Sequence, residues 1–240
     1  MGESRERGRI VKGWSPPERP GPVEMQGRYA RLERLDPARH GGDLYRAKRG
    51  ADAIWDYLPY GPFERESDYR AWAEGVARGT DPVFYAIQDL ESGQWSGVVS
   101  YLRIAPEAGS IEVGHINLAP ELQRSRAATE AMYVMMSWAF AAGYRRYEWK
   151  CYALNRPSRR VAQRLGLSFE GIFRQTTVVK GRNRDTAWFA AIDGDWPTLQ
   201  AAFERWLAPE NFDAGGAQVA RLSALTVPVL VARDPLFGQG

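Results

Sequence analysis

The stretch Leu122–Met132, LQRSRAATEAM, places two arginines and a run of small residues directly before an apolar helical segment. The first turn of a helix has N–H groups without intrahelical acceptors and carries a partial positive charge. Small residues let a ligand approach that backbone, and Arg124 and Arg126 add charge. The pattern is typical of a diphosphate-binding loop. It does not by itself distinguish a nucleotide from coenzyme A, and a basic helix start exposed to water is the alternative.

The strand-like segment before this loop holds two residues that could transfer protons. Glu112 lies in SIEVGHINL, residues 110–118. A carboxylate can act as a base if partial burial brings its pKa toward neutrality. A glutamate that only faces solvent or forms a salt bridge is the alternative. His115 faces the opposite side of a regular strand, unless a β-bulge intervenes. A lone histidine on an apolar strand is more often structural.

The spacing of apolar residues divides the chain into helices and strands. A helix is predicted to start at Asp36-Pro37, and others to cover residues 66–78, 132–142, 157–165 and 196–207. Strands are predicted for residues 29–35, 83–88, 95–104, 110–118 and 146–153, with a closing hairpin of 169–179 and 186–192 across GRNR. The step from 110–118 through the long helix to 146–153 is typical of a right-handed βαβ unit. We therefore predict an α/β chain with a mixed sheet.

The two ends of the chain differ from its middle. Residues 1–22 are polar and include the linker-like SPPERPGP, so we predict an arm outside the core. Residues 23–193 hold the predicted sheet and form the main domain. Residues 194–240 are predicted as a C-terminal helix followed by a tail.

Composition excludes several classes of protein. Among 240 residues, 44% are hydrophobic and 25% charged, as in soluble globular chains. Without an apolar run of membrane-spanning length or a signal peptide, we expect a cytoplasmic protein with no membrane partner. The single cysteine, Cys151, excludes an internal disulfide and is read as a core residue; with only two histidines we expect no metal site. The net charge of +3 leaves nucleic-acid binding as a minor alternative, because the arginines flank the predicted phosphate loop.

Three short motifs carry a resemblance to a known family. The order Q-x-x-R-x-A at Gln123–Ala128 resembles the Q/R-x-x-G-x-G/A loop of GNAT acyltransferases. Asn155, Ser158 and RLGL at Arg164–Leu167 resemble the N-x-x-S/A and K/R-x-G-F motifs of that superfamily. WKCYALNRPSRRVAQRLGLSFEG is most similar to the branch of ribosomal-protein N-terminal acetyltransferases. The resemblance covers roughly residues 23–193.

The resemblance implies a mixed, mostly antiparallel sheet with flanking helices. It also implies direct transfer of acetyl from acetyl-CoA to a primary amine, on a protein N-terminus or a small molecule, in a ternary complex. It is compatible with a homodimer. It gives Glu112 as the base and Ser158 as the donor to the leaving thiolate, although Ser158 equally fits a helix cap. The implied cofactor-binding residues are Leu118, Gln123, Arg124, Ser125, Arg126, Ala127, Ala128, Asn155 and Arg159, and the implied substrate-binding residues are Trp55, Tyr57, His115 and Asp185.

The sequence departs from the family pattern at three positions. Arg126 replaces the usual loop glycine, and Ala162 stands where many relatives have a tyrosine that protonates the thiolate. Thr177 stands where the ribosomal-protein enzymes have a glutamate. These departures keep open an alternative function, an acyl-CoA-binding or regulatory module with little or no transferase activity.

Overall fold

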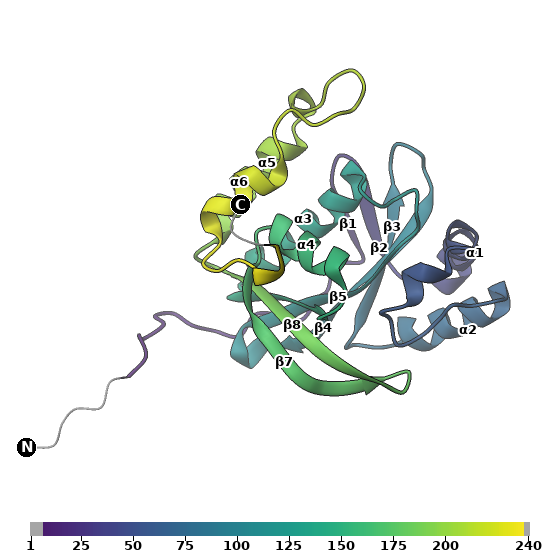
Figure 1. Ribbon diagram of the computed structural model, residues 1–240, viewed down its shortest axis with the longest axis horizontal. Helices are drawn as coiled ribbons and strands as arrows, with labels where there is room; N and C mark the ends of the chain where they lie inside the picture. The colour runs from purple at the N-terminus through teal and green to yellow at the C-terminus, as the bar shows by residue number, and fades with distance from the viewer. Residues whose placement is uncertain (1–6, 238–240) are drawn as a thin grey trace, which may run out of the picture.

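The computed structural model describes residues 7–237 (Figure 1); residues 1–6 of the predicted arm and 238–240 of the predicted tail lie outside the described residues. Eight strands form one sheet in the order β1-β2-β3-β4-β5-β6-β8-β7. Among the described strands, only β5 and β6 pair in parallel. The predicted mixed, mostly antiparallel α/β architecture is confirmed. The strands are β1 Glu24–Gln26, β2 Ala30–Arg34, β3 Val83–Asp89, β4 Trp95–Ala105, β5 Ser110–Leu118, β6 Arg146–Tyr152, β7 Ser168–Val179 and β8 Arg182–Ile192.

Helices cover the two faces of the sheet unequally. On one face α1 and α2 pack over β3 and β4, around a cluster that includes Phe84 and Ala86. On the other face α3 crosses the sheet centre, with α4, α5 and α6 beside it (Figure 1). The helices are α1 Pro37–Lys48, α2 Glu66–Ala77, α3 Arg126–Ala141, α4 Arg156–Arg164, α5 Trp196–Leu207 and α6 Leu222–Thr226, with a short 3-10 helix at Asp52–Trp55.

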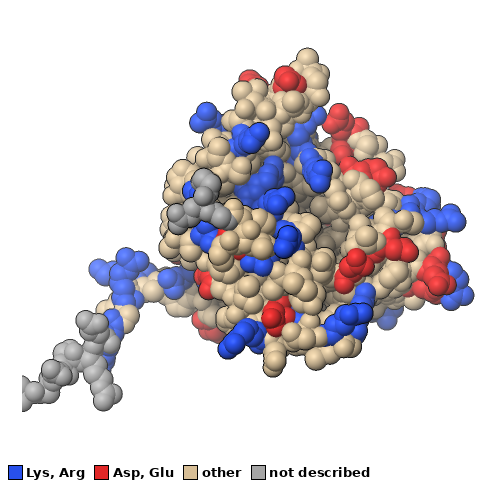
Figure 2. All heavy atoms as spheres, in the orientation of Figure 1, with Lys and Arg blue, Asp and Glu red and all other residues tan. Residues whose placement is uncertain are grey.

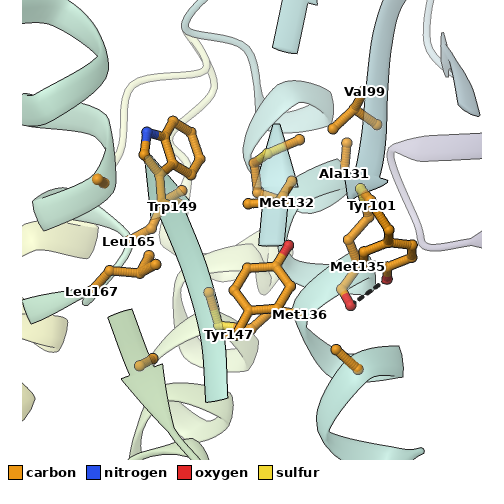
Figure 3. Close-up of a cluster of buried hydrophobic side chains, with 14 of the residues drawn as sticks. Val99, Tyr101, Ala131, Met132, Met135, Met136, Tyr147, Trp149, Leu165 and Leu167 are labelled. Atoms are coloured by element: carbon orange, nitrogen blue, oxygen red, sulfur yellow. Dashed lines mark hydrogen bonds between the residues drawn. The ribbon is translucent and has the colours of Figure 1, made fainter. Parts of the chain in front are cut away.

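The main core lies between α3 and the sheet (Figure 3). Met132, Met135 and Met136 recur at helical spacing and point onto strand residues such as Tyr101 and Trp149. The Tyr101 hydroxyl donates to the Met135 carbonyl at 2.6 Å, which satisfies a buried polar group. Burying one such side chain contributes about 1.5–3 kcal/mol. The start of α3 is held against β2 and the turn before it, where the amides of Arg28, Tyr29 and Ala30 donate to Glu130.

The hairpin β7–β8 differs from its prediction. GRNR was expected to form the loop, but the chain turns at Lys180 and Gly181, which have φ of 49° and 72°. Two left-handed residues form a tight hairpin turn whose twist matches the flanking strands. Strand β8 therefore starts at Arg182. As a consequence, Arg184 and Asp185 are strand residues and face opposite sides of the sheet.

The second half of the predicted arm packs on the domain. Pro17 and Pro20 are buried, and the Tyr85 hydroxyl donates to the Pro22 carbonyl at 3.0 Å. Trp14 lies against Gly109, where a Cβ atom would approach the indole to 2.4 Å. Within the described residues, the segment from Trp14 onward thus belongs to the folded body.

Candidate active site

The two parallel strands at the centre of the sheet separate halfway along their length. β5 and β6 pair from Ser110/Arg146 to Val113/Trp149, although β5 continues to Leu118 and β6 to Tyr152. Beyond this point their facing edges have no strand partner in the described chain. Backbone N–H and C=O groups need hydrogen-bond partners. The gap is therefore suited to an extended ligand that carries amide groups.

A β-bulge in β5 turns His115 away from the α3 core. The register between β4 and β5 shifts here by one residue, and His115 has φ of 51°. Its ring stacks on Tyr60 with centroids 5.6 Å apart and lies 5.0 Å from the ring of Phe84. Phe84 belongs to the cluster under α1 and α2. His115 therefore shares a face of the sheet with Glu112, which only the bulged alternative allowed.

His115 is held as a neutral imidazole. Its Nδ1 atom lies 3.0 Å from the Tyr60 hydroxyl. Burial, together with the charges of Arg103 and Arg184, lowers the pKa of His115 to about 4. Burial also raises the pKa of Tyr60, so its phenol keeps its proton. At neutral pH the pair is uncharged and linked by one hydrogen bond.

Glu112 is a buried carboxylate held by two cations. Its neighbours Ile111 and Val113 face the α3 core, so Glu112 points to the opposite face. Arg103 Nη1 donates to both carboxylate oxygens at 2.7 and 2.8 Å, and Lys150 Nζ lies 3.0 Å from Oε2. Burial raises the pKa of Glu112 above its ordinary value, and the two cations oppose that rise. A carboxylate in this environment can accept a proton nearer neutrality than a solvated one.

The start of α3 presents free backbone donors. Ser125 is the N-cap, and its Oγ accepts from the Ala128 amide at 2.9 Å. The Thr129 amide bonds to the Ser125 carbonyl at 3.4 Å. The N–H groups of Arg126 and Ala127 have no acceptor within residues 7–237. Free amides and the helix dipole together favour an anion at this position.

The Arg126 side chain extends from this helix start toward two aromatic rings and a carboxylate. Its guanidinium stands 4.9 Å from the ring of Tyr29 and 5.0 Å from that of Phe212, and Nη2 lies 3.1 Å from Glu91 Oε2. The cation is therefore kept near the loop by two aromatic rings and one carboxylate. Figure 2 shows further Lys and Arg side chains gathered between the C-terminal segment and α3 and α4, whose exposed arginines include Arg156 and Arg160.

The start of α4 lies at the other side of the gap. Asn155 is the N-cap, with its Oδ1 accepting from the Ser158 amide at 3.1 Å. The Ser158 hydroxyl accepts from Trp149 Nε1 at 3.0 Å and is left with a proton to donate. Trp149 and Lys150 are successive residues of β6 and face opposite sides of the sheet. Ser158 and Glu112 therefore flank β6 from its two faces, and the gap connects them.

Comparison with known proteins identifies the fold. Residues 31–168 match the family model described as an acetyltransferase (GNAT) domain. A GCN5-related N-acetyltransferase from Brucella melitensis is 43% identical, with a TM-score of 0.88 over 90% of this chain and 100% of that chain. A probable GNAT acetyltransferase from Chromobacterium violaceum is 38% identical, with a TM-score of 0.76 over 82% and 100%.

The chain belongs to the GNAT acetyltransferase family. It is an acyl-CoA-dependent N-acetyltransferase, whose family uses acetyl-CoA and acts on amines. A Salmonella typhimurium acetyltransferase that modifies the N-terminal serine of ribosomal protein L7/L12 is 22% identical, with a TM-score of 0.59 over 71% and 97%, and shows the fold alone. No curated protein matches the chain significantly.

The predicted acetyl-CoA residues divide into two groups. Gln123, Arg124, Ser125, Arg126, Ala127 and Ala128 surround the start of α3, Gln123 Nε2 donates to the Leu118 carbonyl at 3.0 Å, and Asn155 lies across the gap. Arg159 is placed differently. Its guanidinium is buried and bonds to Asp234 and to the Ala153 carbonyl. Its donors are thus directed into the protein and away from a ligand.

The predicted acceptor residues are brought together only in part. Tyr57 is 38% exposed and packs edge-on against Tyr152, near the gap. Trp55 is buried among aromatic side chains of the α1–α2 cluster and supports the loop from below. Asp185 accepts from the Gln175 amide at 2.7 Å and from Asn183 Nδ2 at 3.0 Å. The bond from the Gln175 amide, and after it the bond from Asn183, lower the pKa of Asp185. The Asp185 carboxylate therefore stabilises the bulge in β7, and it faces away from Arg184.

Sequence reasoning missed three cations of the site. Arg103, Lys150 and Arg184 come from β4, β6 and β8 and surround Glu112 on its face of the sheet. Lys150 also stands 3.7 Å from the centroid of Trp188. Glu148 and Lys150 are two residues apart on β6, which predicts that both side chains face away from the core. The other two follow from pairing across strands, which one sequence does not reveal.

No group of three or more His, Cys, Asp and Glu side chains among the described residues could hold a metal ion. In the same part of the chain, no helix is long and apolar enough to cross a membrane.

Proposed function

We propose that the enzyme transfers acetyl from acetyl-CoA directly to a primary amine within a ternary complex. One observation carries this proposal: the gap between β5 and β6 runs from the free amides at the start of α3 to the face that holds Glu112 and His115. The diphosphate would bind Arg126 and Ala127 N–H groups, and the pantetheine amides would pair with the free strand edges. The thioester would then lie between Ser158 and Glu112.

Glu112 and Ser158 divide the proton transfers. As the amine nitrogen bonds to the carbonyl carbon, Glu112 accepts the proton that the nitrogen loses. As the C–S bond breaks, the Ser158 hydroxyl donates a proton to the thiolate and regains one from solvent. Ser158 is the hydroxyl that replaces the missing tyrosine at Ala162, which is fully buried. Thr177 is exposed on β7 and leaves Glu112 as our choice of base.

Cys151 does not carry the acetyl group in this proposal. Burial raises the pKa of its thiol to about 11, so the nucleophilic thiolate is scarce at neutral pH. Direct transfer predicts intersecting lines in double-reciprocal kinetics and an active Cys151→Ala variant. A covalent intermediate would give parallel lines and an inactive variant.

We propose two kinds of acceptor: a protein N-terminus, as in the ribosomal-protein branch, or a small-molecule amine. Calorimetry with acetyl-CoA tests the cofactor loop, and thiol release with a panel of amines and peptides tests transfer. Acetyl-CoA binding without thiol release for any acceptor would support the regulatory module instead. No binding heat at all would contradict the role of the loop.

A homodimer is also proposed. Strand β7 is an edge strand of the sheet and exposes Ile172, Phe173 and Val178 at 42%, 52% and 70%. Exposed edges and apolar side chains favour association with another chain. Light scattering at several concentrations tests it, with Val178→Lys expected to shift a dimer toward monomer.

A further inference from the structure

Arg184 carries a charge without a partner. It lies on β8 on the face of the sheet that holds Glu112, and it is half-buried. Its Nε atom is buried without a hydrogen-bond partner. No ion pair or hydrogen bond of its guanidinium exists within residues 7–237. A half-buried cation is ordinarily paired, because desolvation of an isolated charge is unfavourable.

The carboxylates around Arg184 are already engaged. Glu112 is bound by Arg103 and Lys150, and Lys150 also lies 2.7 Å from Glu148 Oε2. Glu148 is bound by Arg146 as well. Asp185, next in sequence, faces the other side and bonds within the hairpin.

Arg184 therefore has no carboxylate of its own among the described residues, because Glu112 is shared with Arg103 and Lys150. Burial is the main cause that lowers the pKa of Arg184, and Arg103 adds to it while Cys151, Glu112 and Tyr152 oppose it. A guanidinium stays protonated at neutral pH. The protein keeps this unfavourable charge directly beside its catalytic face. An anion supplied by a ligand would offset both the desolvation and the repulsion between Arg103 and Arg184.

The surroundings of Arg184 restrict the size of that ligand. Arg184 acts electrostatically on His115, and Glu112 acts on Arg184, so an anion bound at Arg184 lies on the same face of the sheet as the reacting nitrogen. The hairpin tip closes one side, because Lys180 Nζ donates to the carbonyls of Trp55 and Gly61 at 3.2 and 3.0 Å. An acceptor that contacts both Glu112 and Arg184 must carry its amine and its anion on the same molecule.

We propose that Arg184 binds an anionic group of the acceptor, so that the substrates are small primary amines carrying a carboxylate or a phosphate. This inference rests on the proposed function, since it places the amine at Glu112. It disfavours polyamines, which would add positive charge beside Arg103 and Arg184.

Calorimetry on the CoA-loaded protein tests the inference without turnover. The probes are matched pairs: glycine against glycinamide, and O-phosphoethanolamine against ethanolamine, with spermidine added. The pair whose two members differ more in affinity shows whether Arg184 prefers a carboxylate or a phosphate. We expect the anionic member to bind about tenfold to a hundredfold more tightly than its neutral partner. Arg184→Gln should reduce that ratio to about one, and Arg184→Lys should retain part of it.

Arg182→Gln is the matched control, because Arg182 is exposed on the same strand and its replacement removes the same charge. It should leave the ratio unchanged, and equal thermal midpoints should show that both glutamine variants fold. The inference is overturned if neutral amines or spermidine bind as tightly as the anionic probes, if neither anionic probe binds, or if Arg184→Gln weakens both members equally. Thiol release is measured separately, so loss of anion preference with transfer intact contradicts only this inference.

Discussion

Arg159 and Asp234 form a bidentate ion pair that joins α4 to the C-terminal segment. Nε and Nη2 lie 2.7 and 2.6 Å from the two carboxylate oxygens, and both residues are buried. The Asp234 amide also donates to Gln163 Oε1 at 2.7 Å. The pair therefore fixes the C-terminal segment against the helix whose first turn holds Ser158.

Asp234→Ala should strongly destabilise the protein. Removing one partner leaves the Arg159 charge buried and unpaired, which costs roughly 3–5 kcal/mol. Urea unfolding followed by fluorescence measures the loss. Asp68→Asn, which breaks an exposed pair with Arg65, is the control and should leave the midpoint nearly unchanged. Equal midpoints for both variants would mean that the C-terminal segment contributes little to stability.

Lys48 makes stability depend on pH. Its ammonium is buried between Trp55 and Tyr69 with no ion pair to a carboxylate in the described chain, and burial lowers its pKa from 10.5 to about 7. A depressed lysine pKa means that protonation favours unfolding. The destabilisation is full below about pH 7, and it decreases as pH rises from about 7 to 10.5.

Lys48→Met should therefore raise the free energy of unfolding by a few kcal/mol at pH 6.5, since each pKa unit corresponds to about 1.4 kcal/mol. The gain should shrink as the pH approaches 10. Denaturant melts at pH 6.5, 8 and 9.5 measure it, with the exposed Lys12→Met as the control. A gain that does not vary with pH would show that packing, and not titration, is responsible.

Arg126 and Glu91 offer a paired test of the cofactor loop. Arg126→Ala removes a cation beside the α3 amides and should raise the KM for acetyl-CoA roughly tenfold, with kcat changed little. Glu91→Gln removes the competing carboxylate and should leave that KM equal or lower. Initial-rate kinetics at saturating amine measure the KM for acetyl-CoA of both variants. A large fall in kcat for Arg126→Ala would show instead that the aromatic contacts position the helix start.

Local patterns predicted most of the fold, because helix starts and strand alternation depend on residues that are close in the sequence. Asp36 as N-cap, with Pro37 following, is confirmed by bonds from the Ala38 and Arg39 amides to its carboxylate. β5 has the bounds that its alternation predicted. Strand β1, of three residues, is too short to give a pattern and was missed.

The site was less predictable because it depends on departures from regular structure. The orientation of His115 follows from a bulge that is visible only when β4 and β5 pair. Arg184 was read as part of a loop, and the tight turn at Lys180 and Gly181 moved it onto a strand. The Arg159 prediction failed for a different reason, since its partner Asp234 lies 75 residues later in a tail without a readable pattern.

Glu112 and His115 share one face, and their pH dependence should tell which accepts the proton. Burial raises the pKa of Glu112, whereas His115, with a pKa of about 4, is neutral throughout the assay range. A base works only when deprotonated, so the rate should fall as the pH falls through the raised pKa of Glu112.

Glu112→Gln should lower kcat by about a hundredfold to ten-thousandfold and remove this acidic limb, while the affinity for acetyl-CoA changes little. His115→Asn should lower the rate far less and keep the limb, since a neutral ring bonded to Tyr60 only positions the acceptor. Thiol release between pH 5 and 8.5 measures both profiles. An acidic limb that persists in Glu112→Gln and disappears in His115→Asn would transfer the role of base to the histidine, because the carboxylate would then serve only to hold Arg103 and Lys150 in place.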